Sequence, residues 1–393
     1  MEITRIIHPV GQGGFYSERL YDYDNDTEIA VIYDCGGNNQ EVMKSCINKG
    51  LNHTQLIDAV FISHLHDDHI NGLKYLLENF NVRYLFLPQL MEDEIYEAFL
   101  YNCLHSPGSI ANSLILQLYF QNETPRYFPG AETRIATVPR SEENDIFIEG
   151  NSDDVIDIDL SQDNGSIENK LANLSKGKNH IKIHFKNKWL YVPYNPPVKT
   201  VFRCSFYDYF KKELNDGKDF FINDIKSIVE KKKDECKKVY KDFFGTHNAY
   251  SMTLFSGANP VDLRDYRYAP IHYLYWNYPR LWRLRSPNCL YMGDFETKEH
   301  FNQLRQFYEP FWRDIESIQV PHHGSRNNHV SDLYDYARLG FISVGENNRY
   351  RHPNIDTFIK IKEMGCEPIL ITESPNTETW FRASDDRHYL RYK

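Results

Sequence analysis

The sequence lacks the features that mark membrane-spanning and secreted chains. No window approaches the run of about 18 apolar residues that a helix needs to span a bilayer. The N-terminal segment, MEITRIIHPVGQGG, has neither the apolar stretch nor the small-residue cleavage site of a signal peptide. We therefore expect a cytoplasmic protein with no membrane contact.

Paired cysteines and an excess of positive charge are also missing. The 7 cysteines are scattered and form no Cys-x-x-Cys pair, which argues against a disulfide framework and against a zinc finger. The 45 basic side chains are outnumbered by 55 acidic ones, and the net charge of −10 argues against nonspecific coating of DNA. It does not exclude an enzyme that grips nucleic acid locally and neutralises phosphates with metal ions.

What the sequence does contain is a large apolar fraction in an alternating layout. Hydrophobic residues make up 41% of the 393, which suits one large domain or two modest ones. Apolar residues recur with helical spacing near residues 38–49 and again from Asn71. These two predicted helices lie between the first predicted strands, so we expect an α/β layered fold. Strands are predicted at 28–33, 57–63, 82–87, 250–255, 288–292, 316–320, 341–344 and 368–372.

The middle of the chain differs in composition from both ends. Residues 91–248 are predicted to be an insertion that is partly helical, with an acidic and flexible stretch at about 141–180. Such a solvated segment would suit a protein partner. A smaller insertion, 258–287, interleaves aromatic residues with arginines, a mixture that either stacks on nucleic-acid bases or fills a local core.

The strongest chemical signal is the segment SHLHDDH, which directly follows a predicted buried strand. His64 and His66 are two residues apart, so both side chains can turn to one side of an extended backbone and hold one metal ion. Asp68 and His69 can hold an adjacent ion. Imidazole and carboxylate ligands together favour Zn²⁺ or Mn²⁺ over Ca²⁺. The alternative is a solvated loop that happens to be rich in histidine.

The HxHxDH spacing is the signature of the metallo-β-lactamase fold, and further segments narrow the resemblance. The chain resembles the metallo-β-lactamase domain of ComEC-type competence DNA-uptake proteins and their free-standing relatives. The segments that carry this resemblance are VGQGGFY (10–16), ISHLHDDHINGL (62–73), YMGDFE (291–296), VPHHGS (320–325) and SVGENNRYRHP (343–353).

The resemblance implies a fold, a ligand set and an activity. It implies an αββα sandwich whose core is formed by residues 1–90 and 249–393, with the large mixed insertion between them. Asp294 would bridge two divalent ions, His322 or His323 would be the last ligand, and Asp34 would brace the metal loop. The implied activity is phosphodiesterase or nuclease cleavage of nucleic-acid phosphodiester bonds.

The roles of individual residues follow from the chemistry of such a centre. Two ions about 3.5–4 Å apart can share a hydroxide and clamp a phosphoryl group. Asp68 is the predicted catalytic residue that positions the attacking water, because a carboxylate can accept its proton. His352 is predicted to bind phosphate or act as general acid, although a histidine held in a turn before proline is the alternative. Weaker predictions for substrate contact are Ser325, Asn348 and Arg351.

Two questions stay open at this level. Many proteins of this fold supply a third histidine from mid-chain, and the candidates here are His247 and, more weakly, His105. The same fold also hosts hydrolases of lactones, thioesters and amides. Besides a phosphodiesterase and a hydrolase of another bond, a non-catalytic scaffold is a third hypothesis. A scaffold would not need the clustered polar ligands. The substrate is thus expected to be a nucleic acid or a nucleotide, with these alternatives kept.

Overall fold

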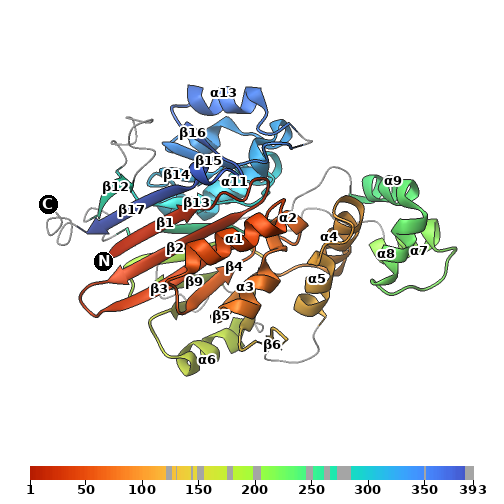
Figure 1. The fold of residues 1–393 in the computed structure, drawn as a ribbon, viewed down its shortest axis with the longest axis horizontal. Helices are drawn as coiled ribbons and strands as arrows, with labels where there is room; N and C mark the ends of the chain where they lie inside the picture. The colour runs from red at the N-terminus through yellow and green to blue at the C-terminus, as the bar shows by residue number, and fades with distance from the viewer. Residues whose placement is uncertain are drawn as a thin grey trace.

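The computed structural model arranges most of the chain into two mixed β-sheets with helices around them (Figure 1). One sheet has nine strands in the order β12-β17-β1-β2-β3-β4-β5-β7-β6, and the other has eight in the order β16-β15-β14-β13-β11-β10-β9-β8. The structure describes residues 1–120, 126–129, 131–142, 145–147, 155–174, 180–197, 205–244, 251–260, 266–271, 285–348 and 351–385.

The strands and helices have the following bounds. The nine-stranded sheet contains β1 (Glu2–Ile7), β2 (Phe15–Asp22), β3 (Thr27–Cys35), β4 (Ile57–Phe61), β5 (Val82–Pro88), β6 (Arg126–Tyr127), β7 (Arg134–Val138), β12 (Tyr266–Ile271) and β17 (Thr379–Asp385). The eight-stranded sheet contains β8 (Val155–Asp159), β9 (His180–Phe185), β10 (Trp189–Tyr194), β11 (Thr253–Ala258), β13 (Cys289–Tyr291), β14 (Ser317–Gln319), β15 (Leu339–Ser343) and β16 (Glu367–Ile371). The α-helices are α1 (Gln40–Leu51), α2 (Asp67–Ile70), α3 (Leu73–Asn79), α4 (Glu92–His105), α5 (Ala111–Tyr119), α6 (Asn164–Leu174), α7 (Phe206–Leu214), α8 (Asp224–Lys231), α9 (Lys233–Phe244), α11 (Thr297–Phe307), α12 (Glu309–Trp312) and α13 (Ile355–Glu363).

Alternation along the strands places the core on both faces of each sheet. In β3, Val31 and Tyr33 belong to the apolar cluster that the two sheets share, whereas Ile32 belongs to the cluster between this sheet and its helices. Trp189 and Leu254 of the other sheet join the shared cluster, because successive side chains of a strand point to opposite faces. This two-sheet α/β arrangement is compatible with a metallo-β-lactamase-like fold.

The segment 91–248, which the sequence sets apart as an insertion, contributes strands to both sheets. β7 pairs in parallel with β5, and β10 pairs with β11. Within the acidic stretch 141–180, the described residues 155–174 form β8 and α6, and Ile156 and Ile158 are buried. β8 reads VIDID and alternates apolar with acidic residues, so its burial is not evident from its composition. The domain bounds expected from the sequence stay a prediction, although strands from 91–248 lie in both sheets.

The remaining expectations about the middle of the chain have mixed outcomes. The segment 91–248, predicted to be partly helical, contains α7, α8 and α9, which pack against α4. In the aromatic segment 258–287, β12 pairs with β17 in the nine-stranded sheet, while residues 261–265 and 272–284 lie outside the described part. Among the described residues, no helix is long and apolar enough to cross a bilayer.

Candidate metal centre

The HxHxDH segment forms a buried loop between β4 and α2. β4 is buried along its whole length, and the chain then runs through residues 62–66 into the short helix α2. The three histidines are 5% (His64), 3% (His66) and 0% (His69) exposed. A solvated histidine-rich loop is therefore excluded, because these imidazoles are withdrawn from water.

Asp34 braces this loop, as the resemblance implies. Its carboxylate accepts hydrogen bonds from the Ser63 amide at 2.7 Å and the Ser63 hydroxyl at 2.8 Å. The same carboxylate lies 2.8 Å from Nδ1 of His69. Because an ionised carboxylate only accepts hydrogen bonds, Nδ1 donates to it, and Nε2 is the nitrogen left to face a metal ion.

Glycines let neighbouring chain segments approach the loop closely. A Cβ at Gly13 would lie 2.4 Å from the Asp68 carbonyl oxygen, and a Cβ at Gly36 would lie 2.5 Å from the same backbone. The glycines of VGQGG and of the turn after β3 thus permit tight turns beneath the metal loop.

Asp294 reaches the loop from the second sheet. It follows β13 through Gly293, whose φ is +54° and whose Cβ position lies 2.6 Å from the Ser63 side chain. Only glycine fits there, and the Asp294 amide then donates a hydrogen bond to the Ser251 hydroxyl at 3.0 Å. Asp294 is thereby held against the first sheet although it belongs to the second.

His323 arrives from the turn after β14. His322 and His323 both have left-handed φ angles of +50° and +52°, an uncommon backbone for residues other than glycine. Nδ1 of His323 donates to the Ser343 carbonyl at 2.8 Å, so its Nε2 is left for a ligand. Strained backbone at such a position is a feature of functional sites.

Five of the predicted ligands converge. His69 Nε2 lies 3.4 Å from Asp294 Oδ1, and His64 Nε2 lies 3.9 Å from Asp294 Oδ2. His323 Nε2 lies 3.5 Å from Asp68 Oδ2 and 3.5 Å from Asp294 Oδ1. Two groups can each gather their ligand atoms within 4.8 Å: one is His64, His69 and Asp294, and the other is Asp68, His69 and His323.

The hydrogen bonding of these atoms fits a metal ion. Among the described residues, the Nε2 atoms of His64, His69 and His323 and Oδ1 of Asp294 are buried without a hydrogen-bond partner. Each such atom costs about 1–3 kcal/mol when left unpaired. The other ring nitrogen of each histidine is held by the protein, as in most metal-ligating histidines. Divalent ions would satisfy these atoms, and the nitrogen and oxygen donors suit Zn²⁺ or Mn²⁺.

The charges of the site also favour cations. Burial opposes ionisation of Asp294, but His322, His323 and His69 outweigh it and hold the pKa of that carboxyl well below its usual range. Burial likewise opposes ionisation of Asp68, yet His69 and His323 lower its pKa. Both carboxylates are therefore ionised at neutral pH.

His66 and His322 occupy different positions from the other predicted ligands. Nε2 of His66 lies 3.5 Å from Oε2 of Glu97, and its ring stacks on Tyr101 at 3.8 Å between centroids. His322 is in neither of the two ligand groups, and its ring centroid lies 6.1 Å from that of His352. Between the two histidines of PHHG, the geometry thus favours His323 as ligand.

The predicted substrate residues lie around the turn before α13. Asn348 accepts a hydrogen bond from the His352 amide at 2.7 Å and donates to the His352 and Gly345 carbonyls, both at 2.8 Å. Its amide is therefore engaged in bracing the turn. Arg351 is exposed with a φ of +57°, and Ser325 is partly exposed. No contact tests their substrate roles, which stay predictions.

Of the two candidates for a third histidine ligand, the structure describes only His105. His247 lies outside the described residues. His105 is exposed at the end of α4, where its ring packs against Tyr101 at 4.2 Å between centroids.

Sequence reasoning missed the contribution of α4. Asn102 donates to the Leu65 carbonyl at 3.0 Å and accepts from the Asp67 amide at 2.9 Å, so it clamps the metal loop. Glu97 and Tyr101 contact His66 from the same helix. A glutamate and a tyrosine four residues apart in the apolar run IYEAFLYNCL were the available signal, since i and i+4 share one helix face.

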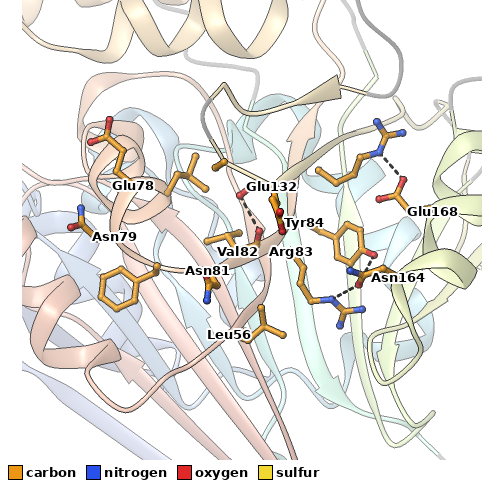
Figure 2. A pocket seen from close by; sticks show the side chains of 15 residues that line it. Leu56, Glu78, Asn79, Asn81, Val82, Arg83, Tyr84, Glu132, Asn164 and Glu168 are labelled. Carbon is orange, nitrogen blue, oxygen red and sulfur yellow. Dashed lines mark hydrogen bonds and ion pairs between the residues drawn. The ribbon is translucent and has the colours of Figure 1, made fainter.

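A larger hollow lies at the opposite end of the same parallel strands (Figure 2). It has a volume of about 1170 Å³ and is lined by the beginnings of β5 and β7 and by α6. Both arginines of its lining are paired within the protein: Arg83 lies 2.9 Å from Asp58, and Arg134 lies 3.1 Å from Glu168. Volume alone therefore does not mark the functional site.

Comparisons with known proteins give a partial match. A family model described as anti-Pycsar protein Apyc1 matches residues 11–137, which is 127 of the 393 residues and includes the HxHxDH loop and α4. The matched family is thus a different one from the competence proteins, whose resemblance stays an expectation. No curated protein matches the chain.

Two solved structures are similar at low scores. The crystal structure of unliganded yeast PDE1 has a TM-score of 0.38 and 10% identity, over 97% of this chain and 100% of that one. A beta-lactamase domain protein from Burkholderia ambifaria has a TM-score of 0.20 and 20% identity, over 37% of this chain and 44% of that one. At TM-scores below 0.5, neither likeness establishes a common fold; what stands is the family match over about a third of the chain.

Proposed function

We propose that this protein is a metal-dependent phosphodiesterase with a metallo-β-lactamase αββα core and two divalent ions, and that its substrate is a cyclic nucleotide. The observation that carries the proposal is the set of buried ligand atoms without partners around Asp294. A family of cyclic nucleotide phosphodiesterases matches the segment that holds the HxHxDH loop.

The residues would divide between two ions that share Asp294. His64 and His66 would hold the first, and Asp68, His69 and His323 the second. When bound, such ions lower the pKa of water and neutralise phosphate charge. The Asp68 side chain is 26% exposed, and its carboxylate would position an attacking water and accept its proton.

His352 would contact the phosphate or the leaving group. Burial, His323 and His322 lower the pKa of His352 to about 4, so its imidazole is neutral at pH 7. A neutral imidazole can donate one hydrogen bond to a phosphate oxygen without adding charge. This supports a role in orienting the substrate more than one as a strong acid.

Cleavage of nucleic acid is the second candidate. The VPHHGS and NRYRHP segments favour it through their resemblance to competence-protein domains. The net charge of −10 weighs against long contacts with a polyanion. A cyclic nucleotide carries one phosphate and needs no such surface.

The test is hydrolysis by purified protein supplied with Mn²⁺ or Zn²⁺. Cyclic mononucleotides, single-stranded DNA, duplex DNA, RNA, a lactone and a thioester would be assayed in parallel. We expect cyclic nucleotide hydrolysis that falls at least about 100-fold in Asp68→Ala. Asp234→Ala is the matched control, because that carboxylate is 92% exposed on α9.

Other outcomes would change the proposal in defined ways. If the protein cleaves DNA or RNA but does not hydrolyse cyclic nucleotides, the nuclease would be favoured. Hydrolysis of only the lactone or thioester, or no hydrolysis by protein that retains bound ions, would overturn the phosphodiesterase.

A further inference from the structure

A second pocket lies between the start of α11, the turn that holds Arg326 and His329, and one face of α13. It has a volume of about 530 Å³, which is in the range of small-molecule sites. None of the side chains that converge on Asp294 lines it. This α11–α13 pocket is lined by basic and polar side chains, among them Lys298, Arg326, His329, Thr357 and Lys360.

Three polar atoms of this lining are buried and have no hydrogen-bond partner among the described residues. They are Oγ1 of Thr357 and the two ring nitrogens of His329. Thr357 is only 2% exposed, and its hydroxyl does not use the carbonyl of the preceding helical turn, as helix threonines often do. The His329 ring stacks on Tyr334, with centroids 5.6 Å apart and planes at 19°. A fixed ring and a buried hydroxyl thus offer donors that the described chain leaves unused.

Positive charge surrounds these atoms. Lys298 enters the lining from α11 and Lys360 from α13. Burial lowers the pKa of His329, and Lys360 and Lys298 lower it further. The imidazole is therefore neutral at pH 7, and it can donate one hydrogen bond. Both lysines are close enough to His329 to act on the same ligand.

The acidic residues of the lining do not cancel this charge. Asp356 lies 3.5 Å from the guanidinium of Arg326, so one carboxylate is already matched by one cation. Glu363 is the other carboxylate of the lining, and in the described part of the chain it forms no ion pair with Lys298 or Lys360. An excess of positive charge remains, which favours an anion as ligand.

The walls of the α11–α13 pocket are held by hydrogen bonds that leave its donors free. Oδ1 of Asn328 accepts from the Thr297 amide at 2.7 Å, and this fixes the positions of the neighbouring residues His329 and Lys298. Asn354 caps α13 by accepting from the Asp356 amide at 3.0 Å. A ligand would therefore enter a site that is already formed, which lowers the entropic cost of binding.

We propose that the α11–α13 pocket binds the phosphate group of a small molecule. A phosphate monoester carries up to two negative charges and three acceptor oxygens. The Thr357 hydroxyl and the His329 N–H would donate to these oxygens, and the ammonium groups of Lys298 and Lys360 would balance the charge. The proposal does not depend on the activity of the metal centre.

The experiment adds sodium phosphate to the purified full-length protein, supplied with Zn²⁺ and labelled with nitrogen-15 at histidine. The side-chain signals of His329, identified by their loss in His329→Gln, report on this pocket and not on the metal centre. We expect a saturable shift in the wild type. Sodium acetate at the same ionic strength controls for screening and for carboxylates, and it should leave the signals in place.

Three variants test the donors. Lys360→Gln should weaken phosphate binding about 10-fold or more, because a charged hydrogen bond is lost. Thr357→Val keeps the shape of the side chain and should weaken binding about 5-fold. Lys362→Gln is the matched control and should bind within about twofold of the wild type. It removes the same charge from the same helix, but Lys362 is outside the lining and lies 3.5 Å from Glu367.

A stability measurement separates a ligand donor from a structural hydroxyl. Because Oγ1 of Thr357 is buried without a partner, Thr357→Val should melt at the same temperature as the wild type or higher in the absence of phosphate. A lower melting temperature would show that the hydroxyl serves the fold, and it would remove Thr357 from the proposed site.

The source of the phosphate group is resolved by parallel titrations with adenosine 5′-monophosphate and adenosine. Tighter binding of the nucleotide than of phosphate would identify a nucleotide as ligand, and equal binding would mean that only the phosphate group is recognised. The proposal fails if adenosine or acetate shifts His329 as phosphate does, or if phosphate gives no saturable shift up to about 10 mM. It also fails if Lys360→Gln and Thr357→Val bind phosphate like the wild type.

Discussion

The two ends of β4 and β5 use charged and polar side chains in opposite ways. At the end that leads into α2, the Nε2 atoms of His64 and His69 are buried and have no hydrogen-bond partner among the described residues. At the other end, Arg83 is bonded to Asp58 and Asn164 at the edge of a large hollow. The first end is arranged for something the chain itself does not supply, and the second is already satisfied.

The comparison teaches which feature of a surface points to function. The hollow offers far more room, yet Arg83 and Arg134 of its lining already pair with carboxylates of the chain. The metal loop offers little room, but it concentrates unpaired ligand atoms at a considerable cost. Binding of a metal ion would offset this free-energy cost. Four changes would break or sharpen this contrast.

The largest effect is expected from Asp294→Ala. Asp294 lies within 4 Å of His64, His69 and His323, so its loss removes the carboxylate that both ligand groups approach. We expect a fall in phosphodiester hydrolysis of about 1,000-fold or more, equivalent to about 4 kcal/mol, and loss of bound metal. Metal analysis and hydrolysis rates check this, and retained activity would remove Asp294 from the centre.

Removal of metal should destabilise only a protein that can bind it. With free metal at about 1,000 times the dissociation constant, binding stabilises the folded state by about 4 kcal/mol. A chelator should therefore lower the melting temperature of the wild type and leave that of Asp294→Ala unchanged. Equal shifts in the two proteins would mean that the stabilising ion binds elsewhere.

At the far end, Asp22→Asn should cost about 2 kcal/mol of unfolding free energy at pH 7. Asp22 is 1% exposed and lies 2.7 Å from Nζ of Lys186, which joins the first sheet to the β9–β10 turn. Burial raises the pKa of Asp22, but Lys186, Asn25 and the Asp24 amide outweigh it and hold it below its usual range.

The pH dependence of this pair has a definite sign. Because the folded pKa of Asp22 is depressed, its contribution is fully present above the unfolded pKa of about 3.9 and is lost as pH falls through the folded value. Denaturant unfolding at several pH values should show wild type and Asp22→Asn differing by a constant amount near neutrality and converging below about pH 4. A gap that persists into strong acid would contradict the ion-pair account.

The smallest effect is expected from Glu168→Gln in the hollow. Glu168 is 30% exposed and pairs with Arg134 at 3.1 Å, so its loss should cost about 0.5 kcal/mol and leave metal content unchanged. Thermal unfolding and metal analysis check both parts. A loss of metal here would erase the contrast between the two ends.

The sequence predicts the local parts of the site well and its long-range parts poorly. His64, Asp68 and His69 are close in the chain and follow a strand, so their proximity needs only local geometry. Asp294 and His323 were placed by resemblance, and the structure brings both to the loop. Glu97 and Asn102 escaped because a helix face identifies its neighbour only once the tertiary packing is known.

The fold was predictable to a similar degree. Buried strands such as β4 (IDAVF) and β15 (LGFIS) are mostly apolar, which their composition reveals. β8 reads VIDID, and its acidic positions made it resemble solvated chain, although Ile156 and Ile158 pack between the sheets. Whether such a strand is buried depends on the strands it pairs with, and a single sequence does not identify those partners.

The sequence separation of the ligands has a consequence for how the protein acquires its metal during folding. His64 and Asp294 are 230 residues apart, and they belong to loops of different sheets. A chain that has formed only its first sheet would have half of a binding site and little affinity. Tight metal uptake would thus mark a late step of folding, when the two sheets dock, and its rate would follow that slow long-range event.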